Sequence, residues 1–206
     1  MVDHQLRNRG IADRRVLQAM LEVPREKFVP ANLIPLAHED AAQPIGYEQT
    51  ISQPFTVAYM VEAARLCGGE KVLEIGTGSG YGAAVLSHLS GQVYTVERIE
   101  KLADAARARL ANLGYANVTV VVGDGSLGLA RYQPYDAIIV TAAARVLPTA
   151  YQDQLADGGR IVIPIGAQFF GQTMYRYTRR GDDWEIDNLG GFAFVPLVTA
   201  EDQAGA

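Results

Sequence analysis

Hydrophobic and polar positions change their spacing near residue 70. Before it, apolar residues recur three and four positions apart over 12–21, which predicts an amphipathic helix that ends before Pro24. A second helix is expected to follow Pro54, and the proline-rich stretch 28–46 between them is expected to be irregular. After residue 70, short apolar runs alternate with segments of helical period. The runs predict strands at 71–75, 92–96, 117–122, 135–140 and 159–165, and the segments between them predict helices at 81–89, 99–113 and 148–155.

This alternation determines the expected fold class. Several of the strands are apolar throughout, which is typical of a parallel sheet covered by helices on both faces. The pattern changes after Gly166, where 172–178 and 185–198 read as antiparallel strands around the turn 179–183. The sequence therefore predicts an α/β fold with a doubly wound, mostly parallel, Rossmann-like sheet. A helical N-terminal extension and antiparallel C-terminal strands complete it.

Composition narrows the classes of protein to which this chain can belong. The 206 residues contain 18 Lys and Arg against 23 Asp and Glu, and a net charge of −5 argues against a protein that coats nucleic acid. The single Cys67 cannot form an internal disulfide and is expected to be a small buried side chain. Cys and His lack zinc-ligand spacing, and no metal is expected. Without a signal core or a long apolar run, the sequence predicts a cytoplasmic protein with no membrane contact.

A glycine-rich turn is the strongest local signal for a ligand site. The strand 71–75 leads into Gly76-Thr77-Gly78-Ser79-Gly80, and a helix follows. In a doubly wound sheet such a turn lies at the carboxyl end of the first strand, where ligands bind. The dinucleotide-binding pattern G-x-G-x-x-G/A does not match the sequence when it starts at Gly76, but it does match from Gly78 to Ala83. A nicotinamide-dependent oxidoreductase and a tight turn without a ligand therefore remain open.

Acidic residues near the ends of neighbouring strands narrow the chemical class of the expected ligand. Glu97 ends the next strand, where it can accept hydrogen bonds from ribose hydroxyls. Asp124, between Gly123 and Gly125, can reach an adenine amino group, and the glycines would leave room for the ring. Glu74 beside the turn suits a cationic ligand or the turn amides. Together these features resemble the class I S-adenosylmethionine-dependent methyltransferases, whose positive sulfonium suits acidic neighbours better than a pyrophosphate would.

The segment before the sheet is more specific than the glycine turn. It reads Gln49-Thr50-Ile51-Ser52-Gln53-Pro54, and Ser52 before a proline-started helix is also a candidate N-cap. With the motifs around it, this segment resembles the protein-L-isoaspartate (D-aspartate) O-methyltransferases, in their bacterial form, from about Leu6 to Val198. The other matching stretches are 23–29, 44–46, 72–81, 96–99, 123–125, 135–143 and 194–197.

The resemblance implies a repair enzyme that moves a methyl group from S-adenosyl-L-methionine to the α-carboxylate of isoaspartyl residues in damaged proteins and peptides. It implies one methyltransferase domain over 1–206, with an N-terminal and substrate-side part (1–65), a cofactor core (70–166) and C-terminal strands (167–206). We expect a monomer that binds no nucleic acid. The residues carried over are Ser52 as the catalytic residue and Thr50, Ile51, Glu74, Gly76, Gly78, Gly80, Glu97, Asp124 and Gly125 at the cofactor.

The expected chemistry needs no general base. A carboxylate with a pKa near 4 is already ionised at about pH 7, so Ser52 would orient it through a hydrogen bond and would not attack as a nucleophile. Two positions depart from the family: Glu48 stands where Gly is usual, and His38 where Tyr is usual. Glu48 would oppose an anionic substrate if it pointed inward. The alternatives are a methyltransferase of another carboxylate or small molecule and a non-catalytic cofactor sensor.

Overall fold

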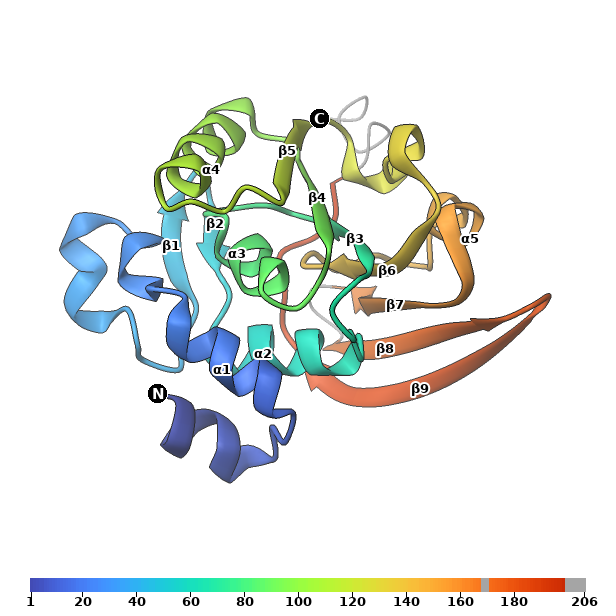
Figure 1. The fold of residues 1–206 in the computed structure, drawn as a ribbon, viewed down its shortest axis with the longest axis horizontal. Coiled ribbons are helices and arrows are strands. Elements are labelled where there is room, and N and C mark those ends of the chain that lie inside the picture. Colours follow the sequence, from blue (N-terminus) through green and yellow to red (C-terminus); the bar gives the residue numbers. More distant parts are fainter. Residues whose placement is uncertain (168–170, 199–206) are drawn as a thin grey trace.

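A sheet of seven strands organises the chain in the computed structural model, which describes residues 1–167 and 171–198 (Figure 1). The strand order is β5-β4-β3-β6-β7-β8-β9; neighbours from β5 to β7 run parallel, and β8 and β9 add antiparallel pairs. The strands are β3 (Lys71–Ile75), β4 (Gln92–Glu97), β5 (Val118–Val122), β6 (Tyr135–Val140), β7 (Leu155–Ala167), β8 (Gly171–Arg180) and β9 (Asp183–Phe192). The predicted fold class is confirmed.

The helices lie where hydrophobic spacing predicts them. They are α1 (Arg14–Glu22), α2 (Pro54–Ala63), α3 (Tyr81–Ser87), α4 (Glu100–Asn112) and α5 (Thr149–Gln154). Capping explains where α1 begins, because the Asp13 side chain accepts a hydrogen bond from the Arg15 amide. Helix α3 begins after Gly80, whose φ of 91° is open to glycine but strained for other residues.

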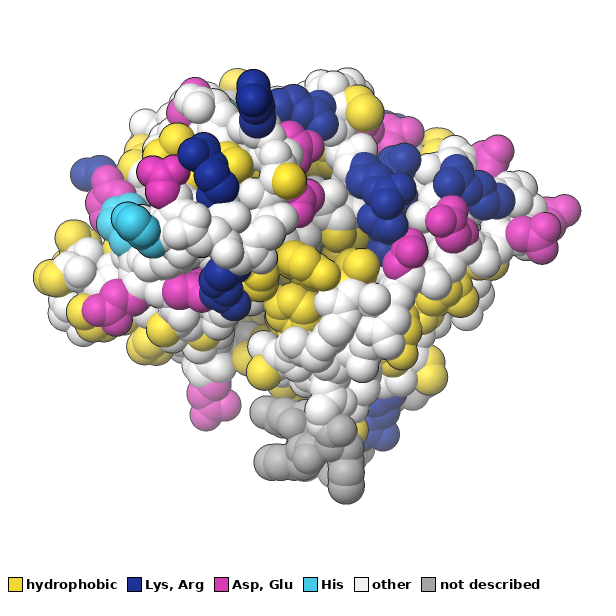
Figure 2. All heavy atoms as spheres, turned by 90° about the horizontal axis from the view of Figure 1, so that it is seen from below, with side chains coloured by type: hydrophobic (Ala, Val, Ile, Leu, Met, Phe, Trp, Pro, Cys, Tyr) yellow, Lys and Arg dark blue, Asp and Glu magenta, His cyan; other side chains and the backbone are white. Residues whose placement is uncertain are grey.

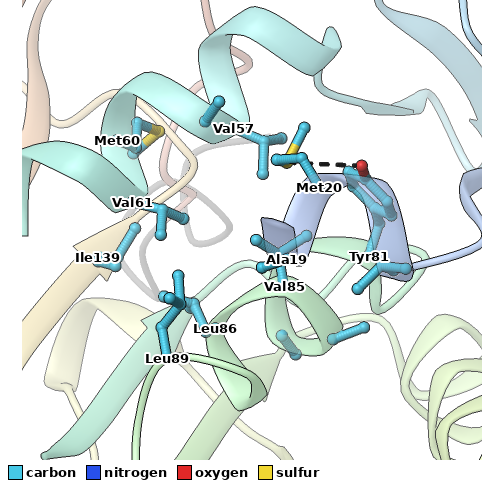
Figure 3. Packing of buried hydrophobic residues seen from close by; sticks show 14 of the residues in the cluster. Ala19, Met20, Val57, Met60, Val61, Tyr81, Val85, Leu86, Leu89 and Ile139 are labelled. Carbon is cyan, nitrogen blue, oxygen red and sulfur yellow. Dashed lines mark hydrogen bonds between the residues drawn. The ribbon is translucent and has the colours of Figure 1, made fainter. Parts of the chain in front are cut away.

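The two faces of the sheet build separate hydrophobic clusters. Alternation along β3 places Val72 in one cluster and Leu73 and Ile75 in the other. Helices α1, α2 and α3 pack on the first face, where Met20 and Tyr81 meet among the buried side chains of Figure 3. Since both faces are covered, the parallel strands can be apolar throughout.

The topology reverses between β3 and β6. From β3 the chain adds β4 and then β5 on one side, and it returns to place β6 on the other. Backbone hydrogen bonds extend the sheet beyond the strand ends, with the Gly76 amide 2.9 Å from the Val96 carbonyl and the Thr141 amide 2.9 Å from the Ile75 carbonyl. Such a reversal opens a crevice at the carboxyl ends of the strands.

The stretch expected to be irregular contains regular structure. A 3₁₀ helix spans Ala31–Leu36, and β1 (Gln43–Gly46) pairs antiparallel with β2 (Gln49–Ile51). The turn between these strands holds Tyr47 and Glu48 at φ values of 53° and 59°. Hairpin turns of this kind normally carry Asn or Gly, so the usual hairpin signal is missing here. Glu48 is exposed at the tip.

The last expected strand is shorter than predicted. Strand β9 ends at Phe192, and the chain then crosses to the end of β6. The Ala143 amide donates to the Val195 carbonyl and the Leu197 amide donates to the Ala143 carbonyl, both at 2.8 Å. The segment 195–198 thus lies beside the loop after β6, a pairing between distant residues that local spacing cannot predict.

Cys67 is exposed, which corrects the expectation that it is buried. The chain leaves α2 through Arg65 at a φ of 51°, so Cys67 falls in a surface turn. There its amide donates to the Glu70 carboxylate at 2.5 Å. The apolar spacing of α2 ends before this residue.

Strand β9 forms one edge of the sheet, and β5 forms the other. The β8–β9 hairpin extends away from the body of the molecule, and Figure 2 shows acidic and basic side chains together at that end. Charges such as the Arg180–Glu185 pair discourage another strand from adding to this edge. No helix among residues 1–167 and 171–198 is long and apolar enough to cross a membrane.

Candidate active site

A pocket lies at the carboxyl ends of β3, β4 and β6. Its other walls are the segment 49–52 leading into α2 and the C-terminal segment 195–198. The predicted site residues that line it are Thr50, Ile51, Ser52, Glu74, Gly76, Gly78, Glu97 and Gly125. Two predicted residues do not line it. Gly80 sits behind the turn against α4, and the Asp124 carboxylate caps the next turn by accepting from the Ser126 amide and hydroxyl.

Close contacts with neighbouring protein atoms explain most of the need for glycine in and near the turn. Gly76 and Gly78 have φ values of 95° and 52°. A Cβ on Gly76 would lie 2.3 Å from the Thr141 hydroxyl oxygen, and one on Gly125 would lie 2.5 Å from an Ile75 methyl carbon. The missing side chain of Gly125 thus allows the loop to pack on β3. That it also leaves room for an adenine ring stays a prediction.

Glu97 joins the glycine turn to the start of α4. One carboxylate oxygen accepts from the Gly78 amide at 2.8 Å, and the other accepts from the Ile99 amide at 2.9 Å. Each carboxylate oxygen has two lone pairs, so both can accept a further hydrogen bond. The fixed carboxylate at the end of β4 is suited to two neighbouring hydroxyls, as on a ribose.

Glu74 is a buried carboxyl at the inner end of the pocket. Its side chain is 1% exposed, and the Thr95 hydroxyl donates to it at 2.6 Å. Burial raises the pKa of Glu74 to about 8; the Thr95 hydrogen bond opposes this, and the negative Glu97 adds to it. Within the described chain, neither Glu74 nor Glu97 forms an ion pair. A cationic ligand would favour the ionised form of Glu74 and attract the Glu97 carboxylate, whereas Glu97 would repel a pyrophosphate.

The raised pKa gives a testable dependence of stability on pH. The unfolded carboxyl titrates near 4.5, so between pH 4.5 and about 8 the folded protein holds a proton that the unfolded chain has lost. This contribution to stability is complete below about pH 4.5 and is lost as pH rises through about 8. Glu74→Gln should remove the slope, so that wild type loses on the order of a few kcal/mol relative to the variant from pH 5 to 8.5. Urea unfolding of both proteins without cofactor measures this, and parallel pH profiles would contradict it.

Ser52 lies at the boundary of two pockets. It is half-buried, and its hydroxyl makes no hydrogen bond to any described residue. It does not cap α2, because Gln53 occupies the N-cap position. The second pocket shares Thr50, Ser52, Thr141 and Val195 with the first. Among the described residues the remaining lining is uncharged and consists of Ala42, Gln53, Thr56, Gly171, Gln172, Phe192, Ala193 and Phe194.

Thr141 is a site residue that sequence reasoning missed. Its hydroxyl is 2.9 Å from both the Ile75 and Gly76 carbonyls, and it ties the end of β6 to the glycine turn. A polar residue directly after the buried strand β6 is a signal that could have identified it. The segment 195–198 was missed as part of the cofactor wall because only the folded chain brings it there.

This pocket is that of a class I S-adenosylmethionine-dependent methyltransferase, since its buried acids favour a sulfonium and its fixed carboxylate favours a ribose. The model of one family, described as protein-L-isoaspartate(D-aspartate) O-methyltransferase, matches residues 1–202. The chain belongs to the protein-L-isoaspartate (D-aspartate) O-methyltransferase family, as its sequence motifs indicate.

Individual relatives agree with this assignment. Proteins named protein-L-isoaspartate O-methyltransferase are 54% identical in Dictyoglomus turgidum, over 93% of this chain and 87% of the relative, and 54% identical in Pelobacter propionicus, over 98% and 90%. A solved structure of that name matches with a TM-score of 0.85 and 31% identity. The match covers 95% of this chain and 65% of the chain in that structure. A Plasmodium falciparum structure in complex with S-adenosyl-L-homocysteine matches with a TM-score of 0.82 and 25% identity over 96% of each chain. S-adenosyl-L-methionine as the cofactor is confirmed, and a nicotinamide cofactor is not supported.

Proposed function

We propose that this chain methylates isoaspartyl residues at the boundary between its two pockets, where Ser52 lies. Transfer of a methyl group from S-adenosyl-L-methionine to isoaspartyl proteins, which starts their repair, is the activity of the family and of this chain. The observation that supports the location is the unpartnered Ser52 hydroxyl, shared by an acidic pocket and an uncharged one. The acidic pocket takes the cofactor and the uncharged one takes the peptide.

In this reaction the main tasks of the protein are to orient the substrate carboxylate and to enclose the reacting groups. When bound, S-adenosyl-L-methionine supplies an electrophilic methyl group. Ser52 donates a hydrogen bond to the substrate carboxylate, which is already ionised and needs no base. Alignment of the reacting groups then supplies much of the rate enhancement. The segment 195–198 excludes water from the cofactor pocket.

The remaining roles concern the cofactor. Glu97 accepts hydrogen bonds from the ribose hydroxyls, and Glu74 offsets the positive charge of the bound cofactor. Thr50 and Ile51 form the wall between the cofactor and the peptide. Asp124 is assigned to the adenine amino group because it directly precedes Gly125, which lines the pocket, although its carboxylate accepts from Ser126 in the structure. Gly80 holds α3 against α4, where a Cβ would lie 3.2 Å from Leu110.

We extend the proposal to the setting of the enzyme. The chain acts as a monomer in the cytoplasm and needs no nucleic acid. It is one domain over 1–206, in which 1–65 serves the substrate side, 70–166 forms the cofactor core and 167–206 adds the C-terminal strands. Support for this division comes from the acidic pocket, which is built largely on the core.

Two matched peptides test the function. One contains isoaspartate and the other contains aspartate at the same position, and both are offered with S-adenosyl-L-methionine labelled in its methyl group. The isoaspartyl peptide is expected to become a base-labile methyl ester, and the aspartyl peptide is not. If neither peptide is labelled while S-adenosyl-L-homocysteine still binds, the proposal is overturned in favour of another substrate or a sensor.

A further inference from the structure

A fully buried arginine lies directly behind Ser52. Arg25 belongs to the 3₁₀ turn Arg25–Lys27 of the N-terminal part and is 0% exposed. Its Nε donates to the Ala37 carbonyl and its Nη2 donates to the Ser52 carbonyl, both at 2.7 Å. Its guanidinium carbon lies 4.6 Å from the ring centroid of Tyr81, which lines the cofactor pocket. Arg25 thus connects the N-terminal part with both proposed binding elements.

The charge of Arg25 is not neutralised by a carboxylate. Within residues 1–167 and 171–198 it forms no ion pair, and its buried Nη1 has no hydrogen-bond partner. Asp40 attracts it from a distance, but that carboxylate is already engaged by Arg9 and by the Phe55 amide. Burial lowers the pKa of Arg25, yet an arginine stays protonated in proteins. The side chain therefore places an unpaired positive charge beside Ser52.

A buried charge without a partner destabilises the folded protein and is unexpected if the side chain serves only packing. An apolar side chain of similar volume usually destabilises the folded state less. The neighbouring pocket makes the charge useful, because the carboxylate of Glu97 would oppose an anionic substrate. A cation behind Ser52 offsets that opposition where the substrate carboxylate must dock.

We propose that Arg25 is a positioning residue for the isoaspartyl carboxylate. It fixes the backbone of Ser52, and its uncompensated charge favours an anion over a neutral group at the Ser52 hydroxyl. This inference rests on the proposed function, which places the substrate carboxylate at Ser52. The charge acts through space and through Ser52, and Arg25 itself stays behind the pocket wall.

The test compares two ligands that differ only in charge. One peptide carries isoaspartate, and its analogue carries the α-carboxamide in place of the α-carboxylate. Affinities for both are measured with S-adenosyl-L-homocysteine bound, in wild type, Arg25→Gln and Arg25→Lys. Arg176→Gln is the control, because Arg176 is another buried arginine that bonds a backbone carbonyl, that of Ala63, but lies away from both pockets. Circular dichroism and thermal unfolding establish that each variant is folded.

The expected readout is the preference for carboxylate over carboxamide. Arg25→Gln should reduce this preference by about 10-fold, whereas Arg25→Lys, which keeps the charge, should stay within about threefold of wild type. Arg25→Lys should still lower kcat, because an ammonium cannot replace the planar fork that holds two carbonyls. Arg176→Gln should leave the preference unchanged even if it lowers the thermal midpoint.

A structural role alone would weaken both peptides equally, and an unchanged preference in Arg25→Gln would overturn the inference. If that variant does not fold, loss of the preference in folded Arg25→Lys overturns it, and retention supports it. Failure of the proposed function looks different. In that case wild type itself would not methylate the isoaspartyl peptide, whatever the behaviour of the arginine variants.

Discussion

Replacing Ser52 with alanine is expected to lower kcat for an isoaspartyl peptide by about 100-fold, because one oriented donor to the reacting anion is lost. Cofactor affinity should stay within about twofold, since the Ser52 hydroxyl has no hydrogen-bond partner among the described residues and the cofactor is held by other groups. Single-turnover methyl transfer and titration with S-adenosyl-L-homocysteine measure the two quantities separately. A loss in kcat without a loss in cofactor affinity is the signature of a residue that acts on the substrate.

Ser87→Ala provides the matched control for this substitution. Ser87 is also half-buried, but its hydroxyl donates to the Ala84 carbonyl within α3, away from both pockets. Its kcat should equal that of wild type. If Ser52→Ala retains the full kcat, Ser52 has no part in orienting the carboxylate, and the site of methyl transfer must be placed elsewhere.

Much of the fold could be predicted because its signals are local. The apolar runs of β3 and β6 are buried on both faces, and Pro54 and Gly114 mark a helix start and a helix end. The hairpin of β1 and β2 escaped prediction because Tyr47 and Glu48 occupy turn positions where glycine is normal. The paired residues Gln43 and Ile51 are buried, so packing rather than turn propensity holds that hairpin in place.

The residues of the candidate site also fall into those that the sequence could predict and those that it could not. Glu74 and Glu97 could be predicted because parallel strands bring their carboxyl ends to one edge. Arg25 and the segment 195–198 could not, because they come from opposite ends of the chain and meet the pocket only in the folded molecule. Gly125 could be placed near the pocket from the sequence, but its close approach to Ile75 could not, because that contact forms only in the folded chain.

Glu97→Ala is expected to weaken binding of S-adenosyl-L-homocysteine by about 100-fold. The substitution removes the acceptor for the ribose hydroxyls and also the two bonds that fix the Gly78 and Ile99 amides, each a hydrogen bond to a charged group. Glu97→Gln should fall between alanine and wild type, because its amide can accept from only one of the two N–H groups. Titration calorimetry measures the three affinities.

The control and the kinetic readout separate binding from catalysis. Glu100→Ala removes an exposed carboxylate only three positions away, at the start of α4, and should leave the affinity within about twofold of wild type. At saturating cofactor, Glu97→Ala should recover most of its kcat, because the groups that orient the substrate carboxylate remain in place. If kcat stays low at saturation, Glu97 also shapes the glycine turn for methyl transfer, and the division between a cofactor-binding Glu97 and a substrate-orienting Ser52 is wrong.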